Sequence, residues 1–175
     1  MRSTRMHALW VDENYPHFIS SVTHGRQNIF SDVACASALI DEIRWYQHAY
    51  NVKVIAAVVM PDHFHAILWP QGRHTFSDFM RSVKSRCARR VGEIMTGRGM
   101  GPPPIGGDTT IPWGSDTYIP KIWQSSFFDY VIPSEEKLNE KILYILRNPV
   151  EDNLVAQWHE YPYILLHDDY RSVDL

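Results

Sequence analysis

The stretch VKVIAAVVMPDHFHAILW, residues 52–69, decides the fold. Its first nine residues are almost all apolar and rich in β-branched side chains, which is typical of a buried strand. Pro61-Asp62 is a turn signal. Residues 63–69 alternate in polarity and predict a second strand, paired with the first as a hairpin, although Pro61 could instead mark a bulge. The stretch therefore predicts a buried β-hairpin whose second strand carries His63 and His65.

Segments on either side of this hairpin predict an α+β protein. Strands are predicted at residues 17–23 and 121–132, because both are rich in β-formers. Apolar periodicity and capping residues predict three helices: to about Tyr50 behind Ser31 or Asp32, to about Met95 behind Thr75 or Ser77, and to about Asn148 behind Ser134, with Pro149 as its stop. The order β-α-β-β-α-β-α indicates a ferredoxin-like sandwich, an antiparallel sheet with helices on one face.

Length and composition indicate one globular domain over residues 1–175. The chain is 45% hydrophobic and 13% aromatic, and it is long enough to bury a core without staples. A glycine- and proline-rich loop is expected at residues 97–120, and an irregular tail from about residue 150. Cys35 and Cys87 form no CxxC pair and are expected to be reduced and packed. With neither a signal peptide nor a membrane-length apolar run in view, we expect a cytoplasmic protein.

The distribution of charge matters more than its total. The net charge of −3 argues weakly against nucleic acid as a partner, yet residues 75–101 hold six basic and two acidic side chains. Five of the basic residues lie on one predicted helix and spread over much of its circumference: Arg81, Lys84, Arg86, Arg89 and Arg90. They predict a grip on DNA phosphates, and a solvated helix face is the alternative. Trp113, Tyr118 and Trp123 are candidates for stacking on unpaired bases.

His63 and His65 form a candidate metal site. Alternate residues of a strand point to the same face, so the two imidazoles can converge on one ion while Phe64 packs into the opposite face. A His-x-His pair alone is weak support, but here it directly follows a buried strand and a tight turn. Two polar rings in an otherwise apolar row need partners, and a metal ion is one.

Tyr144 and Asn148 form a second candidate pair, four residues apart on a predicted helix and so on one face. The amide oxygen of Asn148 is a hard ligand suited to Mg²⁺ or Mn²⁺. A tyrosine beside that metal would suit phosphodiester transesterification, which needs a nucleophile that stays attached to the DNA and preserves the bond energy. Packing and helix termination are the alternative roles of these two residues.

Four motifs occur in order along the chain and together resemble a known family. They are VVMPDHFHAIL at 58–68, FSDFMRSVKSRCARRV at 76–91, IWQSSFFDYVI at 122–132 and YILRNPV at 144–150. They are similar to the HUH strand, the basic helix with its recurrent lysine (here Lys84), the WQ-x-x-F strand and the catalytic helix of the REP-associated tyrosine transposases. These belong to the single-tyrosine HUH transposases of small bacterial insertion sequences. The resemblance covers residues from about 15 to 165.

This resemblance implies an HUH fold and a metal-dependent enzyme that nicks and joins single-stranded DNA. It implies that His63, His65 and Asn148 bind Mg²⁺ or Mn²⁺, with Asn148 where the insertion-sequence enzymes use glutamine, and that Tyr144 is the nucleophile. The implied intermediate is a 5′-phosphotyrosine link with a free 3′-OH. The implied substrate is hairpin-forming repeat DNA with a short guide sequence. A monomer is implied, whereas the insertion-sequence relatives are dimers.

Some features depart from the family, and alternatives stay open. Asp62 stands where asparagine is common, and the loop at 97–120 is long. Tyr130 is a rival nucleophile, although neither Asn nor Gln follows it at helical spacing. The alternative function is a non-catalytic DNA-binding module that acts on repetitive palindromic elements. An unrelated metallohydrolase is a third possibility, but HExxH, P-loop and GxSxG motifs are missing from the sequence.

Overall fold

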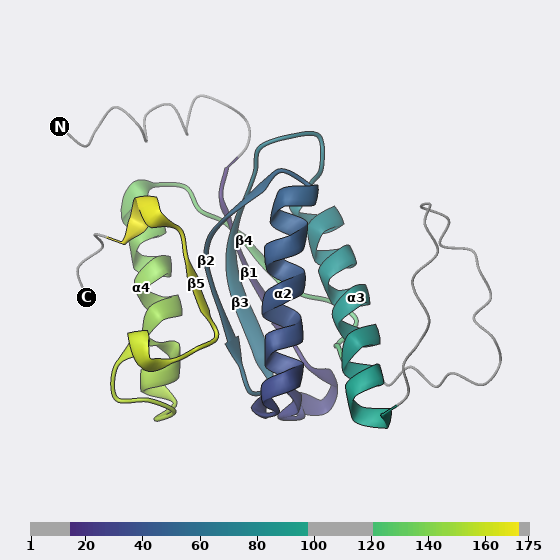
Figure 1. Cartoon of the computed structure of the whole chain (residues 1–175). Coiled ribbons are helices and arrows are strands. Elements are labelled where there is room, and N and C mark those ends of the chain that lie inside the picture. Colours follow the sequence, from purple (N-terminus) through teal and green to yellow (C-terminus); the bar gives the residue numbers. More distant parts are fainter. Residues whose placement is uncertain (1–14, 98–120, 172–175) are drawn as a thin grey trace.

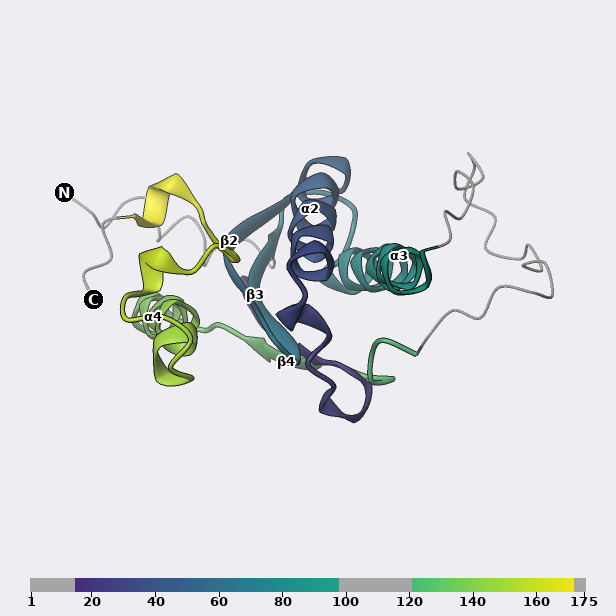
Figure 2. The ribbon, with the colours of Figure 1, turned by 60° about the horizontal axis from the view of Figure 1, so that its bottom comes forward.

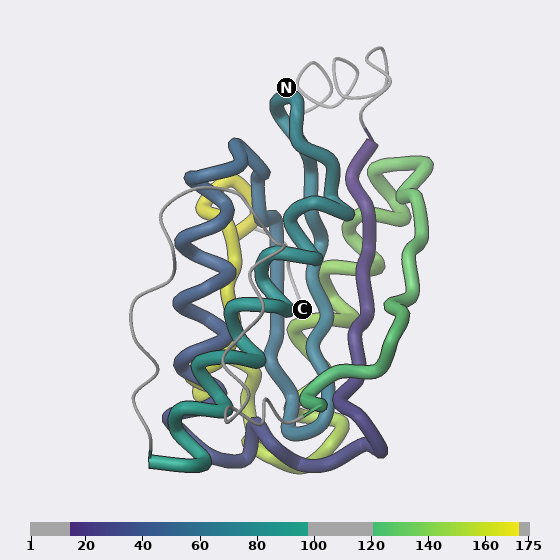
Figure 3. The backbone as a smooth tube through the Cα atoms, turned by 90° about the vertical axis from the view of Figure 1, so that its right-hand side faces the viewer, coloured from purple at the N-terminus to yellow at the C-terminus, as the bar shows by residue number. Residues whose placement is uncertain are grey.

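The fold is built on a five-stranded antiparallel sheet (Figure 1). The computed structural model describes residues 15–97 and 121–171, so most of the predicted glycine- and proline-rich loop lies outside it. The strand order is β4-β1-β3-β2-β5, and Figure 3 shows β4 beside β1 at one edge of the sheet. The strands are β1 (His17–Val22), β2 (Val52–Met60), β3 (His63–Pro70), β4 (Phe128–Val131) and β5 (Ile164–Leu166).

The hairpin predicted from residues 52–69 lies in the middle of this sheet. Met60 pairs with His63 across a two-residue turn made of Pro61 and Asp62. The register shift in this pair lies near Val54, at the far end of β2, and not at Pro61. Because β1 pairs with the other edge of β3, the strand that carries the histidines has neighbours on both sides.

Side-chain caps begin all three α-helices, α2 (Val33–Ala49), α3 (Phe76–Thr96) and α4 (Glu135–Glu151). Asp32, Thr75 and Ser134 each accept a backbone N–H of the first turn, and Thr75 forms a reciprocal capping box with Asp78. The expected stop at Pro149 was wrong: α4 continues to Glu151. Proline in the last turn removes a single helical hydrogen bond, and the Asp152 N–H then closes the helix on the Asn148 carbonyl.

The helices cover both faces of the sheet (Figure 2). The β-α-β-β-α-β core with order β4-β1-β3-β2 confirms the predicted ferredoxin-like topology. However, only α2 and α3 share a face, and α4 covers the other, so the expectation of helices on one face was wrong. The cause lies in β2, where Val54 and Val59 join the core under α2 and α3 while Val58 and Met60 join the core under α4. A strand that is apolar on both faces needs cover on both.

The C-terminal part of the chain is more regular than predicted. After α4 the chain crosses to the far edge of the sheet, where β5 pairs with β2. The strand predicted at 121–132 is shorter: β4 begins at Phe128, and Trp123 makes only an isolated bridge with Thr23.

Within the described residues, we find no helix both long and apolar enough to traverse a bilayer.

Candidate active site

Both candidate histidines lie on β3 and face α4. His63 and His65 pair with Met60 and Val58, which belong to the core under α4. Phe64 between them belongs to the core on the opposite face, as predicted from strand alternation. The two imidazole centroids are 4.7 Å apart. The sheet therefore presents both rings at one place.

The His63 ring is held by a chain of polar contacts. Its Nδ1–H donates a 2.5 Å hydrogen bond to Asp62, and Asp62 also accepts one of 3.0 Å from Arg26. Burial by itself would raise the pKa of Asp62, but these two cationic or donating neighbours outweigh it and hold that pKa below its ordinary value. With Nδ1 committed to a carboxylate, Nε2 of His63 is the nitrogen left for a metal, an arrangement typical of metal-binding histidines.

His65 is buried, with 5% of its surface exposed. Its ring stacks on Phe18 at 5.2 Å, and its Nδ1 is a buried atom that finds no hydrogen-bond partner among the described residues. Burial, followed by electrostatic interaction with His63 and Lys141, lowers the pKa of His65 to about 3. The ring is therefore neutral at physiological pH, which is the form of imidazole that binds metals.

Tyr144 approaches His65 from α4, which is 79 residues later in the chain. Its hydroxyl lies 3.4 Å from Nε2 of His65, and the two ring centroids are 5.2 Å apart. The helix holds this position because Leu138, Ile142 and Ile145 bury its apolar face against the sheet. Tyr144 itself is 40% exposed, so part of this side chain is open to solvent.

Asn148 lies one helical turn beyond Tyr144 and is buried. Its Nδ2 donates to the Tyr144 carbonyl at 3.2 Å, so Oδ1 is the atom that could bind a metal. Among the described residues, no three His, Cys, Asp or Glu side chains gather closely enough to hold a metal by themselves. The third protein ligand predicted for this place is the amide of Asn148. Two imidazoles, one with an unpartnered nitrogen, and an amide oxygen fit a divalent cation such as Mn²⁺ or Mg²⁺.

Lys141 is a member of this cluster that we did not predict from the sequence. Its ammonium lies 5.2–5.7 Å from the ring centroids of Phe18, Tyr130 and Tyr144. None of the carboxylates in the described part of the chain forms an ion pair with it. The signal was present in the helical spacing, because residues 141, 144 and 148 share one face of α4.

The five basic residues predicted to bind DNA each have a partner within the fold. The ammonium of Lys84 donates to the carbonyls of Gln124 and Ser126, at 3.1 and 3.4 Å. Arg86 and Arg90 pair with the buried Glu42 of α2, and Arg90 also reaches Asp41. Arg81 and Arg89 pair along α3 with Asp78 and Glu93. Of the five, Arg81 is the most exposed.

We predict that Arg86 and Arg90 stabilise the packing of α2 on α3. An Arg86→Gln/Arg90→Gln variant should lose about 3 kcal/mol of unfolding free energy in urea denaturation, because it leaves the buried Glu42 carboxylate unpaired. Arg81→Gln, on the solvent side of the same helix, should change the unfolding free energy by less than about 0.5 kcal/mol. Equal stability of the two variants would contradict this role for the ion pairs.

We also predict that Asp62 sets the metal affinity through His63. In Asp62→Ala, His63 loses its orienting acceptor, so Mn²⁺ should bind about 10- to 100-fold more weakly in a titration followed by electron paramagnetic resonance. Asp129→Ala is the matched control, because it removes a carboxylate bonded at 2.8 Å to another histidine, His17. Equal Mn²⁺ affinity in the two variants would rule out an orienting role for Asp62.

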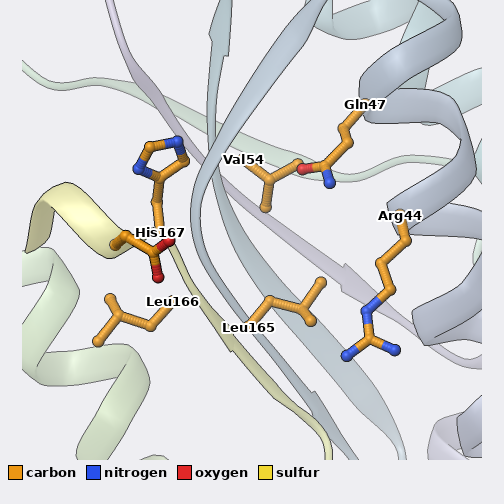
Figure 4. A pocket seen from close by; sticks show the side chains of 7 residues that line it. Arg44, Gln47, Val54, Leu165, Leu166 and His167 are labelled. Carbon is orange, nitrogen blue, oxygen red and sulfur yellow. The ribbon is translucent and has the colours of Figure 1, made fainter. Parts of the chain in front are cut away.

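Trp123 and a separate surface cleft are not part of this site. Trp123 is buried and donates its indole N–H to the Lys84 carbonyl, so it belongs to the core and offers no stacking surface, whereas Trp113 and Tyr118 lie outside the described residues. A cleft of about 180 Å³ opens between α2 and β5, with Arg44 and Gln47 on one side and Leu165 and His167 on the other (Figure 4). None of the candidate catalytic residues lines it.

Comparison with known proteins relates the sequence and the fold of this chain to transposases. The structure is similar to that of a REP-associated tyrosine transposase bound to a REP hairpin (TM-score 0.65, 21% identity, 92% of this chain and 82% of that one). It is also similar to a candidate transposase from Deinococcus radiodurans R1 (TM-score 0.51, 20% identity, 77% of this chain and 90% of that one). At these identities the likeness supports the fold. No curated protein matches the sequence.

The sequence itself carries the family assignment. Residues 11–98 match the model of a family described as "Transposase IS200 like". This segment is half of the chain and includes β1, the hairpin with its two histidines, and α3. The chain belongs to the IS200-like transposase family.

Proposed function

We propose that this transposase-family protein is a metal-dependent enzyme that nicks and rejoins single-stranded DNA, with Tyr144 as its nucleophile. The observation that carries the proposal is the 3.4 Å approach of the Tyr144 hydroxyl to His65, which joins a helix and a strand far apart in sequence at one solvent-accessible place. A tyrosine nucleophile and side chains that can hold a divalent cation are the groups that this chemistry uses.

The reaction is a transesterification, so it needs no external energy source. The Tyr144 oxygen attacks the scissile phosphorus, a phosphorus–tyrosine bond forms, and the bond from phosphorus to the 3′ oxygen breaks. The phenol loses its proton and the departing 3′ oxygen gains one. One phosphodiester replaces another, which allows a 3′-OH to attack the phosphotyrosine later and reseal a strand.

His63, His65 and Asn148 would hold the divalent cation, Mn²⁺ or Mg²⁺. Such a cation supplies Lewis acidity at the scissile phosphate, which compensates for the weak nucleophilicity of a phenol. The chain's own part is to keep His65 neutral by burial and to fix His63 through Asp62 and Arg26. These contacts prepare the ligands before the metal binds.

We propose hairpin-forming repeat DNA as the substrate, read with a short guide sequence. The motifs at 58–68, 76–91, 122–132 and 144–150 support this, and so does the similar fold of a transposase that was solved with a REP hairpin. We further propose that the active unit is a monomer. Support comes from the contact between Tyr144 and His65 of the same chain, which needs no second subunit to complete the site.

A covalent-trapping experiment tests the proposal. Purified protein and Mn²⁺ are incubated with labelled oligonucleotides that share a hairpin stem and carry a randomised single-stranded flank, so that the guide need not be known. A labelled protein band that survives denaturing electrophoresis is the expected result, and EDTA should remove it. DNA binding that is insensitive to EDTA and never yields such a band would instead support the non-catalytic DNA-binding module.

A further inference from the structure

The side chain of Phe18 lies at the centre of an aromatic cluster on the catalytic face. Its ring stacks with His65 and meets Tyr144 edge-on, with centroids 5.2 and 5.8 Å apart. The same ring contacts Phe128 edge-on at 6.5 Å and carries the Lys141 ammonium at 5.2 Å. The candidate catalytic residues and two side chains without an assigned role therefore share one buried neighbour.

Phe128 is an exposed aromatic beside the site. Ser20 of β1 pairs with Phe128 on one side and with His65 on the other, so all three lie in one row across the sheet. The strand spacing puts Phe128 roughly 10 Å from His65. Despite its contact with Phe18, 58% of Phe128 is exposed. A large apolar ring open to solvent next to a site for DNA chemistry fits a base, because every base has a face that stacks on an aromatic ring.

Lys141 supplies the matching charge. Three aromatic rings hold its ammonium, but rings leave its charge uncompensated. Neither nearby acid forms an ion pair with it: Glu140 pairs with Lys137 and acts on Lys141 only through space, and Asp62 pairs with Arg26 and His63. A half-buried cation in this situation attracts a phosphate.

We propose that Phe128 and Lys141 form a binding subsite for one unpaired nucleotide next to the scissile phosphate. Phe128 stacks on its base and Lys141 binds a phosphate of its backbone. This inference rests on the proposed function for the identity of the ligand, and it adds a sequence-independent contact to single-stranded DNA. β4 is an edge strand, so a second copy of this chain is the competing occupant of this surface.

The stacking contact is tested with two strands that differ only in their bases. The probes are end-labelled dT12 and a twelve-unit abasic phosphodiester strand, with binding measured by fluorescence anisotropy in EDTA so that no cleavage occurs. Phe128→Ala should weaken dT12 binding about tenfold and leave binding of the abasic strand unchanged. Phe128→Trp, unlike Phe128→Ala, should bind dT12 with the affinity of the unaltered protein, and the fluorescence of the new indole should be quenched on binding.

A matched control variant and a second measurement show whether Phe128 stacks on a base. Trp45→Ala removes an aromatic that is 61% exposed on α2, against the opposite face of the sheet, and should leave both affinities unchanged. An equal effect of Phe128→Ala on the two strands, or no effect, would overturn the stacking contact. If the variant instead lowers the sedimentation coefficient of the free protein, Phe128 serves a contact between copies.

The phosphate contact is tested through salt. In Lys141→Gln the slope of log affinity against log salt concentration should become shallower by about 0.7 on both strands, the value for one phosphate contact on a single strand. Lys137→Gln, one turn earlier on α4 with its ammonium bound by Glu140, is the control and should leave the slope unchanged. An unchanged slope in Lys141→Gln would reject the phosphate contact.

These outcomes are separable from failure of the proposed enzyme. Binding is measured without metal, whereas the covalent adduct requires it, so a protein that forms the adduct but shows no base-dependent loss in Phe128→Ala lacks only the subsite. A protein that passes both binding tests but forms no adduct keeps the subsite and loses the proposed catalysis. If the unaltered protein does not bind dT12 at low salt, the subsite is rejected whatever the adduct assay gives.

Discussion

Tyr144→Phe is expected to abolish the covalent protein–DNA adduct. The substitution removes the one atom that would form the bond to phosphorus, and loss of a nucleophile costs an enzyme at least about 10³-fold in rate. The ring and its packing beside Phe18 and His65 remain. Because the lost hydroxyl makes only a 3.4 Å contact at a half-exposed position, unfolding free energy should change by less than about 1 kcal/mol. Denaturing electrophoresis and urea denaturation provide the two measurements.

Tyr130→Phe is the matched control for this prediction. Tyr130 lies on β4 opposite Phe18 and shares the Lys141 ammonium with Tyr144, so its environment is similar. The Tyr130→Phe variant should form the adduct at the rate of the unaltered protein. An adduct that persists in Tyr144→Phe and disappears in Tyr130→Phe would identify Tyr130 of β4 as the nucleophile and reject the assignment of Tyr144.

His63→Gln is expected to remove both metal binding and adduct formation. Replacing a polar contact behind a metal ligand costs 10- to 100-fold in affinity, so loss of the ligand itself should cost at least about 100-fold in Mn²⁺ affinity. His63 is a better choice than His65 because its ring is half-buried, and a glutamine there leaves no cavity in the core. Titration with Mn²⁺ measures the first effect and the trapping assay the second.

Two controls make this result specific. His48→Gln changes an exposed histidine on α2, away from β3, and should leave Mn²⁺ affinity unchanged. EDTA treatment of the unaltered protein should reproduce the loss of adduct, and restored Mn²⁺ should reverse it. Adduct formation by His63→Gln at the normal rate would mean that the histidine pair is not the metal site.

Local chemistry made much of the fold predictable. A continuous apolar run, a Pro-Asp turn and an alternating segment predict the hairpin at 52–69. The capping residues Asp32, Thr75 and Ser134 mark where the helices begin. The side of the sheet that each helix covers was harder to predict, because this depends on both faces of β2 being apolar. The short strand β5 has little alternation and is defined by its pairing with β2.

The site shows the same division. His63 and His65 share a face because strand geometry requires it, and Tyr144 and Asn148 share one because helix geometry does. Which positive charges stay available could not be predicted from sequence. Five basic residues on α3 suggested a DNA surface, but contacts with Glu42, Asp41 and two backbone carbonyls engage three of them. Conversely, Lys141 stood beside Glu140 in sequence, and only the tertiary structure shows that Glu140 forms its ion pair with Lys137.

The path of the chain after β4 bears on how neighbouring molecules can cooperate. The chain leaves β4 at one edge of the sheet, crosses one face as α4 and pairs with β2 as β5 at the other edge. The segment is therefore held by strand pairing at both ends. Exchange of α4 between two molecules would require β5 to detach from β2. In the proposed monomer, each molecule is expected to use its own phenol with its own imidazoles. Mixing two inactive variants, one defective in the helix and one in the hairpin, should not restore activity by intersubunit complementation.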